Sequence, residues 1–315
     1  MEMNGYLCRT KVRGDMRSTA ELPQIPSITL GREPEAASDL SVHDLSKGYE
    51  TEVLDFLAVR SLHTVYMAGF IRDNGLESPL NRGTFYGCRN SLGQLLGVAL
   101  IGHVTQIETR TSEALCALAR AAQSCSSAHV IMGEKEKIEA FWNHYARAGQ
   151  SLRLACRELL LEQCWPVEAG EEVSELRPAT AADLSLVMPA QAEMALAECG
   201  VNPLEVDPAG FQGRCMRRVE RGRVWVSVKD GRLAFKADIM AETPEVVYLE
   251  GVYVNPRERG KGYGRRCLLQ LGRRLLSRSR SICLLVNERN TEAQGFYYGA
   301  GYRFRSLYET IYLHK

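Results

Sequence analysis

The sequence predicts an α/β protein with mixed sheets, built from two similar domains in tandem. Its 315 residues suffice for two domains that each bury a core. The same order of predicted elements, helix, hairpin, strand, helix, strand and helix, occurs before and after residue 170. A strand, a glycine-rich loop and a helix follow one another around residues 252–264. We expect a mobile tail over residues 1–40, a first domain over 41–168 and a second over 172–315.

In the first domain, apolar residues at helical spacing alternate with short apolar runs that suit strands. They predict one or two helices over residues 54–70, then a hairpin, a helix, a strand and a last helix. The hairpin turn is Asn90-Ser91-Leu92-Gly93. The other expected elements are the strands 84–89, 95–102 and 129–132 and the helices 112–122 and 138–147.

The second domain has stronger local signals. Thr180 and Asp183 have the spacing of a helix capping box, and Asp207-Pro208 suits the start of another helix. Asp230-Gly231 is a strong turn between two hairpin strands. The fully apolar residues 282–286 predict a strand at the centre of the sheet. The other expected elements are the strands 176–179, 224–228, 233–240, 246–254, 302–306 and 308–313 and the helices 263–279 and 291–299.

The glycine-rich stretch has the features of an anion site. Residues 252–264 read VYVNPRERGKGYG, a strand end followed by a loop and a helix start. Glycines let backbone N–H groups converge, and the dipole of the helix favours negative charge at its start. Four cations lie among residues 257–265. A plain solvated turn rarely combines three glycines and four cations, so we expect a bound anion.

Two other glycine motifs are excluded by their spacing. The dinucleotide fingerprint requires glycine at position 265, where the chain has Arg265, and the βαβ unit that flanks it is missing. A Walker loop requires serine or threonine after Gly-Lys, whereas Lys261 is followed by Gly262.

The loop residues 259–264, RGKGYG, after a strand ending in Val-Asn-Pro, resemble the acetyl-CoA pyrophosphate loop of the GNAT superfamily of N-acetyltransferases. A second motif of this superfamily follows at the expected distance. It is formed by Asn290, Ala293, Tyr297 and Gly301. The resemblance covers about residues 174–315. The full chain also resembles GNAT proteins with a divergent N-terminal half and, more loosely, the tandem mycothiol synthases.

This resemblance implies acetyl-CoA as co-substrate and assigns the residues that bind it. The glycine loop would hold the pyrophosphate, the preceding strand would bond the pantetheine arm through its backbone, and Asn290 would bond the arm through its side chain. Tyr297 would lie near the thioester sulfur. The implied contacts are Val252, Tyr253, Val254, Arg259, Gly260, Lys261, Gly262, Tyr263, Gly264, Asn290 and Tyr297.

The expected chemistry is attack of a neutral amine on the thioester, with no covalent enzyme intermediate. Tyr297 can donate a proton to the departing sulfur; the alternative is an aromatic packing residue. For the base, relatives use a glutamate at the position that Tyr248 occupies here, and Glu250 lies two residues on, on the same strand face. Glu250 is our candidate base; the alternative is a structural ion pair with Lys236 or an arginine. Asp238 and Glu198 are weaker candidates.

Short matches between the halves indicate two copies of one fold, the first degenerate. Gly97-Val98-Ala99 matches Gly251-Val252-Tyr253, and Ala148-Gly149 matches Ala300-Gly301. In the first copy, residues 107–112 stand where the phosphate loop is expected. They contain no glycine, and Glu108 would repel a phosphate. We therefore expect the first half not to bind coenzyme A.

Composition narrows the class of protein. The net charge is +1, but residues 251–315 contain thirteen Lys/Arg and four Asp/Glu, which suits a polyanionic ligand. No zinc-finger, helix-turn-helix or RNA-binding signature favours nucleic acid. None of the ten cysteines forms a C-x-x-C pair, and no signal peptide or membrane span is visible. We expect a cytoplasmic protein with reduced cysteines and no metal, which binds neither nucleic acid nor a membrane.

The sequence thus predicts a transferase that moves an acetyl group from acetyl-CoA to an amine acceptor in a ternary complex. The acceptor is a small molecule or a peptide, and the pattern indicates neither its identity nor an oligomeric state. The rival hypothesis is a non-catalytic, acyl-CoA-binding regulatory or scaffold protein. Tyr248, at the position of the usual glutamate, favours this rival, whereas Asn290 and Tyr297 favour the enzyme.

Overall fold

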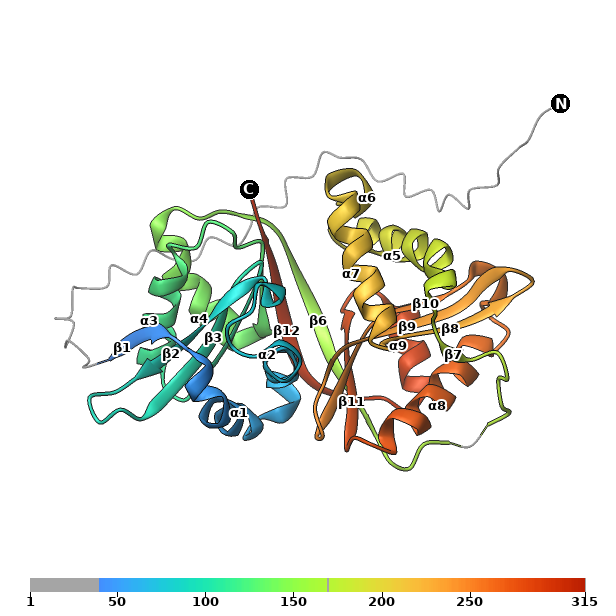
Figure 1. The fold of residues 1–315 in the computed structure, drawn as a ribbon, viewed down its shortest axis with the longest axis horizontal. Helices are drawn as coiled ribbons and strands as arrows, with labels where there is room; N and C mark the ends of the chain where they lie inside the picture. Colours follow the sequence, from blue (N-terminus) through green and yellow to red (C-terminus); the bar gives the residue numbers. More distant parts are fainter. Residues whose placement is uncertain (1–39, 169, 315) are drawn as a thin grey trace. The chain divides into compact units, whose positions relative to one another are not determined.

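The computed structural model describes residues 40–168 and 170–314. The expected tail lies outside the described residues, apart from Leu40. The first half runs through β1 (Ser41–Asp44), α1 (Glu50–Ala58), α2 (Ser61–Asn74), β2 (Gly83–Arg89), β3 (Leu95–Gly102), β4 (Val104–Thr109), α3 (Ser112–Ala122), β5 (Val130–Glu134), α4 (Lys135–Tyr145) and β6 (Leu152–Cys164) (Figure 1).

The second half repeats this order with one added short helix, α6. It runs through β7 (Arg177–Pro178), α5 (Leu184–Cys199), α6 (Pro203–Val206), α7 (Pro208–Glu220), β8 (Val224–Lys229), β9 (Arg232–Glu242), β10 (Val246–Val254), α8 (Tyr263–Leu276), β11 (Ser281–Asn287), α9 (Thr291–Gly299) and β12 (Arg303–Leu313). None of the described helices is long and apolar enough to cross a membrane.

Local sequence explains many of these boundaries. The capping box of Thr180 and Asp183 is present, and the carboxylate of Asp207 accepts the N–H of Gly210 at 3.0 Å to start α7. At the turn between β8 and β9, Asp230 and Gly231 both have positive φ, 49° and 70°. Such angles match the twist of a two-residue hairpin. These predictions are confirmed.

The sheet joins the two halves through an exchange of strands. Within the described residues twelve strands form one sheet, in the order β1-β2-β3-β4-β5-β12-β6-β11-β10-β9-β8-β7. The last strand of the second half, β12, lies between β5 and β6 of the first half. Conversely β6 lies between β11 and β12. Figure 1 shows β6 and β12 side by side where the two halves meet.

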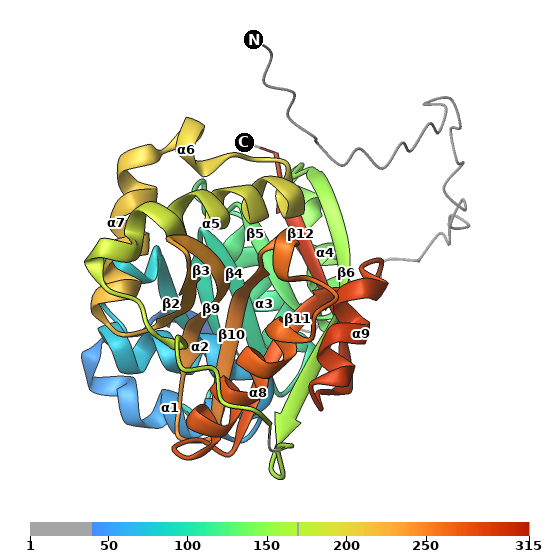
Figure 2. The same cartoon turned by 90° about the vertical axis from the view of Figure 1, so that its right-hand side faces the viewer.

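The exchanged strands also carry core residues across. Leu161 of β6 is fully buried in the core under α8 and α9, which cover one face of the second half in Figure 2. Ile311 and Leu313 of β12 are buried in the core of the first half, with α3 and α4. A third core lies between the halves, where α2 packs on β9 and β10. The approach is close, because a Cβ atom at Gly69 would lie 2.7 Å from that of Ala241.

The predicted α/β fold class is therefore confirmed, and the strand pairing explains two errors. The two terminal strands expected at 302–306 and 308–313 are one strand, β12, whose register shifts between Phe304 and Ser306. A bulge bends a strand without ending it. The strands β4 and β6 were missing from the prediction. The predicted domain boundary at 168–172 falls between β6 and β7. Because the segments on its two sides share one sheet, their division into two domains stays a prediction.

Of the two short sequence matches between the halves, one joins equivalent positions of the fold and the other does not. Gly97 lies on β3 and Gly251 on β10, so this match does not align equivalent strands. By contrast, Gly149 and Gly301 both follow the last helix of their half, with φ of 91° and 92°. The left-handed conformation ends a helix at low cost only for glycine.

We expect the halves to depend on each other for folding. Residues 172–315 expressed alone should fail to reach a stable fold, because β11 and β12 both lose their partner β6. Coexpression with residues 40–168 should restore a soluble complex. Copurification of tagged halves and near-ultraviolet circular dichroism measure this. A folded, isolated segment 172–315 that binds acetyl-CoA would contradict the expectation.

Candidate active site

In the second half, β10 and β11 separate partway along their length. They pair in parallel only from Val246 to Tyr248, although both strands continue well beyond. A register shift in β10 falls between Glu250 and Tyr253, at Gly251, whose φ is 59°. The bulge turns β10 away from β11. The result is a gap beside the backbone of residues 249–254.

A buried ion pair holds this bulge. Lys236 of β9 is fully buried, and its ammonium group lies 2.8 Å from the carboxylate of Asp238. The same ammonium donates to the carbonyl of Gly251 at 3.1 Å and to Gln191 at 2.6 Å. Lys236 is therefore bound to Asp238 and the bulge. The alternative of a structural ion pair for Glu250 stays open with an arginine, since the charge of Arg218 acts on Glu250.

The glycine loop follows at the end of β10 and leads directly into α8. Gly260 and Gly262 have φ of 70° and 71°, and Gly262 precedes the first residue of the helix. No described atom lies within 4 Å of a Cβ built on either glycine, so the loop surface is open. Arg259 donates to the carbonyl of Val254 at 3.1 Å and ties the loop to the strand. A helix N-terminus with an open glycine loop fits a pyrophosphate.

The other loop residues have distinct positions. The side chain of Tyr263 is buried, and its hydroxyl lies 2.6 Å from that of Ser227, so only its backbone faces the loop. Lys261 is 62% exposed, and its ammonium group lies 3.9 Å from the carboxylate of Glu258. A Cβ atom at Gly264 would lie 2.5 Å from Val254, so glycine is needed for close packing there.

Asn290 and Tyr297 lie at the far side of the gap, on α9. The side-chain oxygen of Asn290 accepts the N–H of Ala293 at 3.0 Å and caps the helix, so its amide group is left for a ligand. Tyr297 is 9% exposed and packs edge-on against Tyr302. Burial raises the pKa of its hydroxyl, which therefore keeps its proton.

Two cavities meet at these residues. The smaller, of about 430 Å³, runs along the glycine loop, and the larger, of about 1140 Å³, runs between the halves. Both are lined by Val252, Arg259, Asn290, Ala293 and Tyr297. An extended molecule anchored on the loop can thus pass the gap and present its end to the larger cavity.

The first half forms part of the larger cavity. Tyr66 and Phe70 of α2 line it, together with Tyr248, whose ring contacts that of Tyr66 edge-on at 6.4 Å. Tyr248 is 5% exposed and packs in the core between the halves. An aromatic ring at this position therefore joins the two halves.

Acidic residues from several elements line this cavity, among them Glu158 of β6, Glu198 of α5 and Glu250 of β10. Desolvation raises the pKa of Glu250, against the nearby charge of Arg218 and the hydroxyl of Tyr248. The pKa values of Glu158 and Glu198 are raised to about 7, mainly by desolvation and in part by the charge of Glu250. Glu198 is nonetheless an exposed residue of α5. Mutual repulsion favours a shared proton at neutral pH.

Glu158 was absent from the sequence-based candidates. It lies opposite Asn287 of β11 and accepts a hydrogen bond from Thr310 of β12. It reaches the second half's site only because β6 is exchanged. The available signal was a single acidic residue directly before the apolar run Leu159-Leu160-Leu161. A carboxylate within a buried strand needs a partner or a polar cavity.

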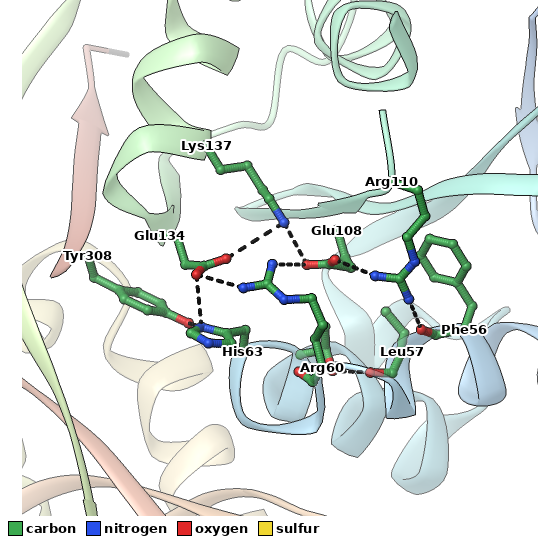
Figure 3. Close-up of polar contacts among 10 residues, drawn as sticks. Phe56, Leu57, Arg60, His63, Glu108, Arg110, Glu134, Lys137 and Tyr308 are labelled. Atoms are coloured by element: carbon green, nitrogen blue, oxygen red, sulfur yellow. Dashed lines mark hydrogen bonds and ion pairs between the residues drawn. The ribbon is translucent and has the colours of Figure 1, made fainter. Parts of the chain in front are cut away.

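The first half has the equivalent gap but closes it. Its strands β4 and β5 pair only at Val104 with Val130 and at Thr105 with Ile131. Beyond these pairs, Arg60 and Lys137 bridge the strands, as Figure 3 shows. Arg60 binds Glu134 at 2.7 Å, and Lys137 binds Glu108 at 2.7 Å.

Glu108 is the centre of this network. It is 2% exposed on its side chain and also pairs with Arg60 at 3.3 Å and with Arg110 at 2.8 Å. The connection from β4 to α3 contains only Arg110 and Thr111, and Thr111 caps α3 through its hydroxyl. No room for a phosphate loop exists in this connection.

Comparison with known proteins agrees with the geometry of the second half. Residues 220–304 match a family model described as an acetyltransferase (GNAT) domain. The resemblance to the GNAT superfamily is thus confirmed, and this family transfers acyl groups. No curated protein sequence matches the chain.

Solved structures show the same fold over both halves. An acetyltransferase of the GNAT family from Colwellia psychrerythraea is 13% identical, with a TM-score of 0.54 over 87% of this chain and 100% of its own. A tandem GNAT protein from the clavulanic acid biosynthesis pathway is 13% identical, with a TM-score of 0.53 over 86% and 98%. A Drosophila protein is 12% identical, with a TM-score of 0.62 over 88% and 99%. These similarities confirm the tandem arrangement as a fold.

We expect one acetyl-CoA to bind per chain, on the glycine loop of the second half. Gly262→Val should abolish most of this affinity, because a β-branched residue is strained at a φ of 71° and its side chain would cover the loop. Isothermal titration with acetyl-CoA measures both the affinity and the number of sites.

Gly93→Val is a matched control. Gly93 has a φ of 78° and open space around it, but it lies in the hairpin between β2 and β3. This variant should lose similar stability and keep its affinity. Two equivalent sites per chain, or full affinity in Gly262→Val, would refute the assignment.

Proposed function

We propose that the protein is an acyl-CoA-dependent N-acetyltransferase whose single active site lies in the second half. The observation that carries this proposal is the meeting of two cavities at Tyr297, one along the glycine loop and one lined by carboxylates. Acetyl-CoA, when bound, would supply the thioester. The loop, the backbone at residues 252–254 and the amide of Asn290 would hold it, and the larger cavity would hold an amine.

Each step then has a group in place. Glu158, Glu198 and Glu250 share a proton at neutral pH. Glu250 in its ionised state accepts the proton of the acceptor amine. The amine nitrogen forms a bond to the acetyl carbon while the carbon–sulfur bond breaks. A backbone N–H near Val252, beside the bulge, can stabilise negative charge on the acetyl oxygen. The protonated hydroxyl of Tyr297 can donate to the departing sulfur.

The alternative is an acyl-CoA-binding regulatory protein without catalysis. Such a protein would bind acyl-CoA through the same glycine loop and gap. It would need neither a proton donor at Tyr297 nor acidic groups in the larger cavity. The larger cavity, with Glu158, Glu198 and Glu250 in its lining, favours the enzyme. Screening amines and peptides for coenzyme A release separates the two, since the regulatory protein releases none.

Tyr297→Phe tests the proposed acid. Its affinity for acetyl-CoA should stay unchanged, because the ring keeps its packing against Tyr302. The turnover number should fall by roughly 10²–10⁴-fold, the range of a positioned general acid. Tyr298→Phe is the control, since Tyr298 is 39% exposed and lines neither cavity. An unchanged rate in Tyr297→Phe would remove this hydroxyl from the mechanism.

Glu250→Gln tests the proposed base through the pH profile. A carboxylate base works when deprotonated, so activity of the native protein should rise with pH through a region near 7, where Glu158 and Glu198 also titrate. Glu250→Gln should flatten this limb, and the residual limb should move to lower pH because one negative charge is gone. The dependence of kcat/KM on pH measures it. Glu205→Gln, on α6, should keep the native profile; a native profile in Glu250→Gln would refute the role.

A further inference from the structure

The wall of the larger cavity opposite the glycine loop is rich in arginine. Most of these residues lie on α7 or directly after it, and some have structural partners. Arg218 pairs with the buried Asp238 at 3.2 Å, and Arg221 pairs with Asp73 of α2 at 3.5 Å. Arg223 also binds Asp73. These three arginines connect α7 and the following turn to β9 and to the first half.

Three further arginines line the cavity with fewer partners: Arg82, Arg214 and Arg217. Arg214 binds Asp207 at 2.9 Å. Arg82 and Arg217 form no ion pair with any carboxylate of the described residues. Desolvation lowers the pKa of Arg82, and the neighbouring charge of Arg214 lowers it further. Cations that repel each other beside a cavity are stabilised by an anion.

The backbone of Arg82 is held in an unusual conformation. Its φ is 54° and its ψ 33°, in the left-handed region that few residues other than glycine adopt. The preceding Asn81 is buried and donates to the carbonyl of Gly75 at 2.9 Å. The carbonyl of Arg82 accepts the N–H of His103 at 2.8 Å. Such a conformation persists only where the surroundings fix it, and it often marks a functional position.

Tyr66 lies between the acidic and the basic parts of the cavity. It is 6% exposed, and its hydroxyl has no hydrogen-bond partner among the described residues. The charges of Glu250 on one side and of Arg82 and Arg218 on the other all act on it. The hydroxyl is not among the buried polar atoms that lack a partner, so it is accessible from the cavity, where a ligand that spans the cavity can bind it.

We propose that the acceptor carries a separate anionic group, a carboxylate or a phosphate, in addition to its amine. The amine lies against the carboxylates Glu158, Glu198 and Glu250, and the anionic group binds Arg82 and Arg217. The inference rests on the proposed acyl transfer and names the class of amine. A simple amine or a diamine would satisfy the carboxylates but leave the guanidinium groups and Tyr66 without a partner.

Matched acceptors test the proposal. The series comprises ω-amino acids of three to eight carbons, the aminoalkyl phosphates of the same lengths, and three sets without an anion: the ω-amino amides, the n-alkylamines and the α,ω-diamines. Coenzyme A release gives kcat/KM for each. An anionic acceptor of suitable length should exceed its amide by about 10- to 100-fold, the range for hydrogen bonds to charged groups. Comparing carboxylates with phosphates identifies the anion.

Two variants locate the anion site. Arg82→Gln and Arg217→Gln should each raise KM for the anionic acceptors by about 10-fold or more and leave KM for the amides unchanged. They lie on different elements, so local misfolding at Arg82 would not produce the same result at Arg217. Arg232→Gln is the control, because Arg232 lies in the exposed turn of the β8–β9 hairpin.

The outcomes separate this inference from the proposed function. Equal or better turnover of amines without an anion would overturn the inference while acyl transfer stands. If no amine is turned over, the same compounds are titrated into the protein saturated with coenzyme A, and their affinities are compared. Tighter binding of the anionic compounds than of their amides would support the anion site and refute catalysis. Equal affinity for the anionic compounds and for their amides would overturn both the anion site and the proposed acyl transfer.

Discussion

The pairing of β6 with β12 is the constraint on which the rest of the structure depends. The two strands are antiparallel from Leu152 to Glu162, and each occupies the place beside the other half's fifth strand. Because both are central, neither half can complete its sheet without the other. The exchange also fixes α2 over β9 and β10, where Gly69 permits contact with Ala241. The larger cavity is thus a product of the joined halves, with Tyr66 and Glu158 supplied by the first.

Both halves contain a gap between two diverging parallel strands, which is filled in the first half and open in the second. In both, two parallel neighbours pair briefly and then diverge, which leaves backbone groups beside a gap. In the first half, arginine and lysine side chains neutralise Glu108 and Glu134 across the gap and fill it. In the second half, Lys236 and Asp238 neutralise each other behind the bulge and leave the gap open. Placing the ion pair behind the strand rather than between the strands is what preserves a binding site.

The sequence predicted those parts of the site that depend on local signals. Glycines in residues 260–264 and the hairpin turn at Asp230 determine their own conformation within a few residues, and the structure has them as expected. The helix cap formed by Asn290 is an addition from the structure. Which of them bind a ligand stays a prediction. The position of Glu158 in the cavity and the exchange of β6 could not be predicted from the sequence. The residue pattern of a strand indicates its buried face but not which strands lie beside it. The same limit made one bent strand, β12, look like two.

The electrostatics of the cavity follow from this architecture. Glu158 comes from β6, Glu250 from β10 and Glu198 from α5, so no single element accumulates the charge. Desolvation raises the pKa of all three, and the charge of Glu250 adds to the shifts of Glu158 and Glu198. Repulsion of this kind persists in a folded protein when stability elsewhere compensates for it and when a ligand relieves it. A cationic amine is the simplest such ligand. In the proposed reaction, the negative charge that is unfavourable in the empty cavity would therefore also attract the amine and accept its proton.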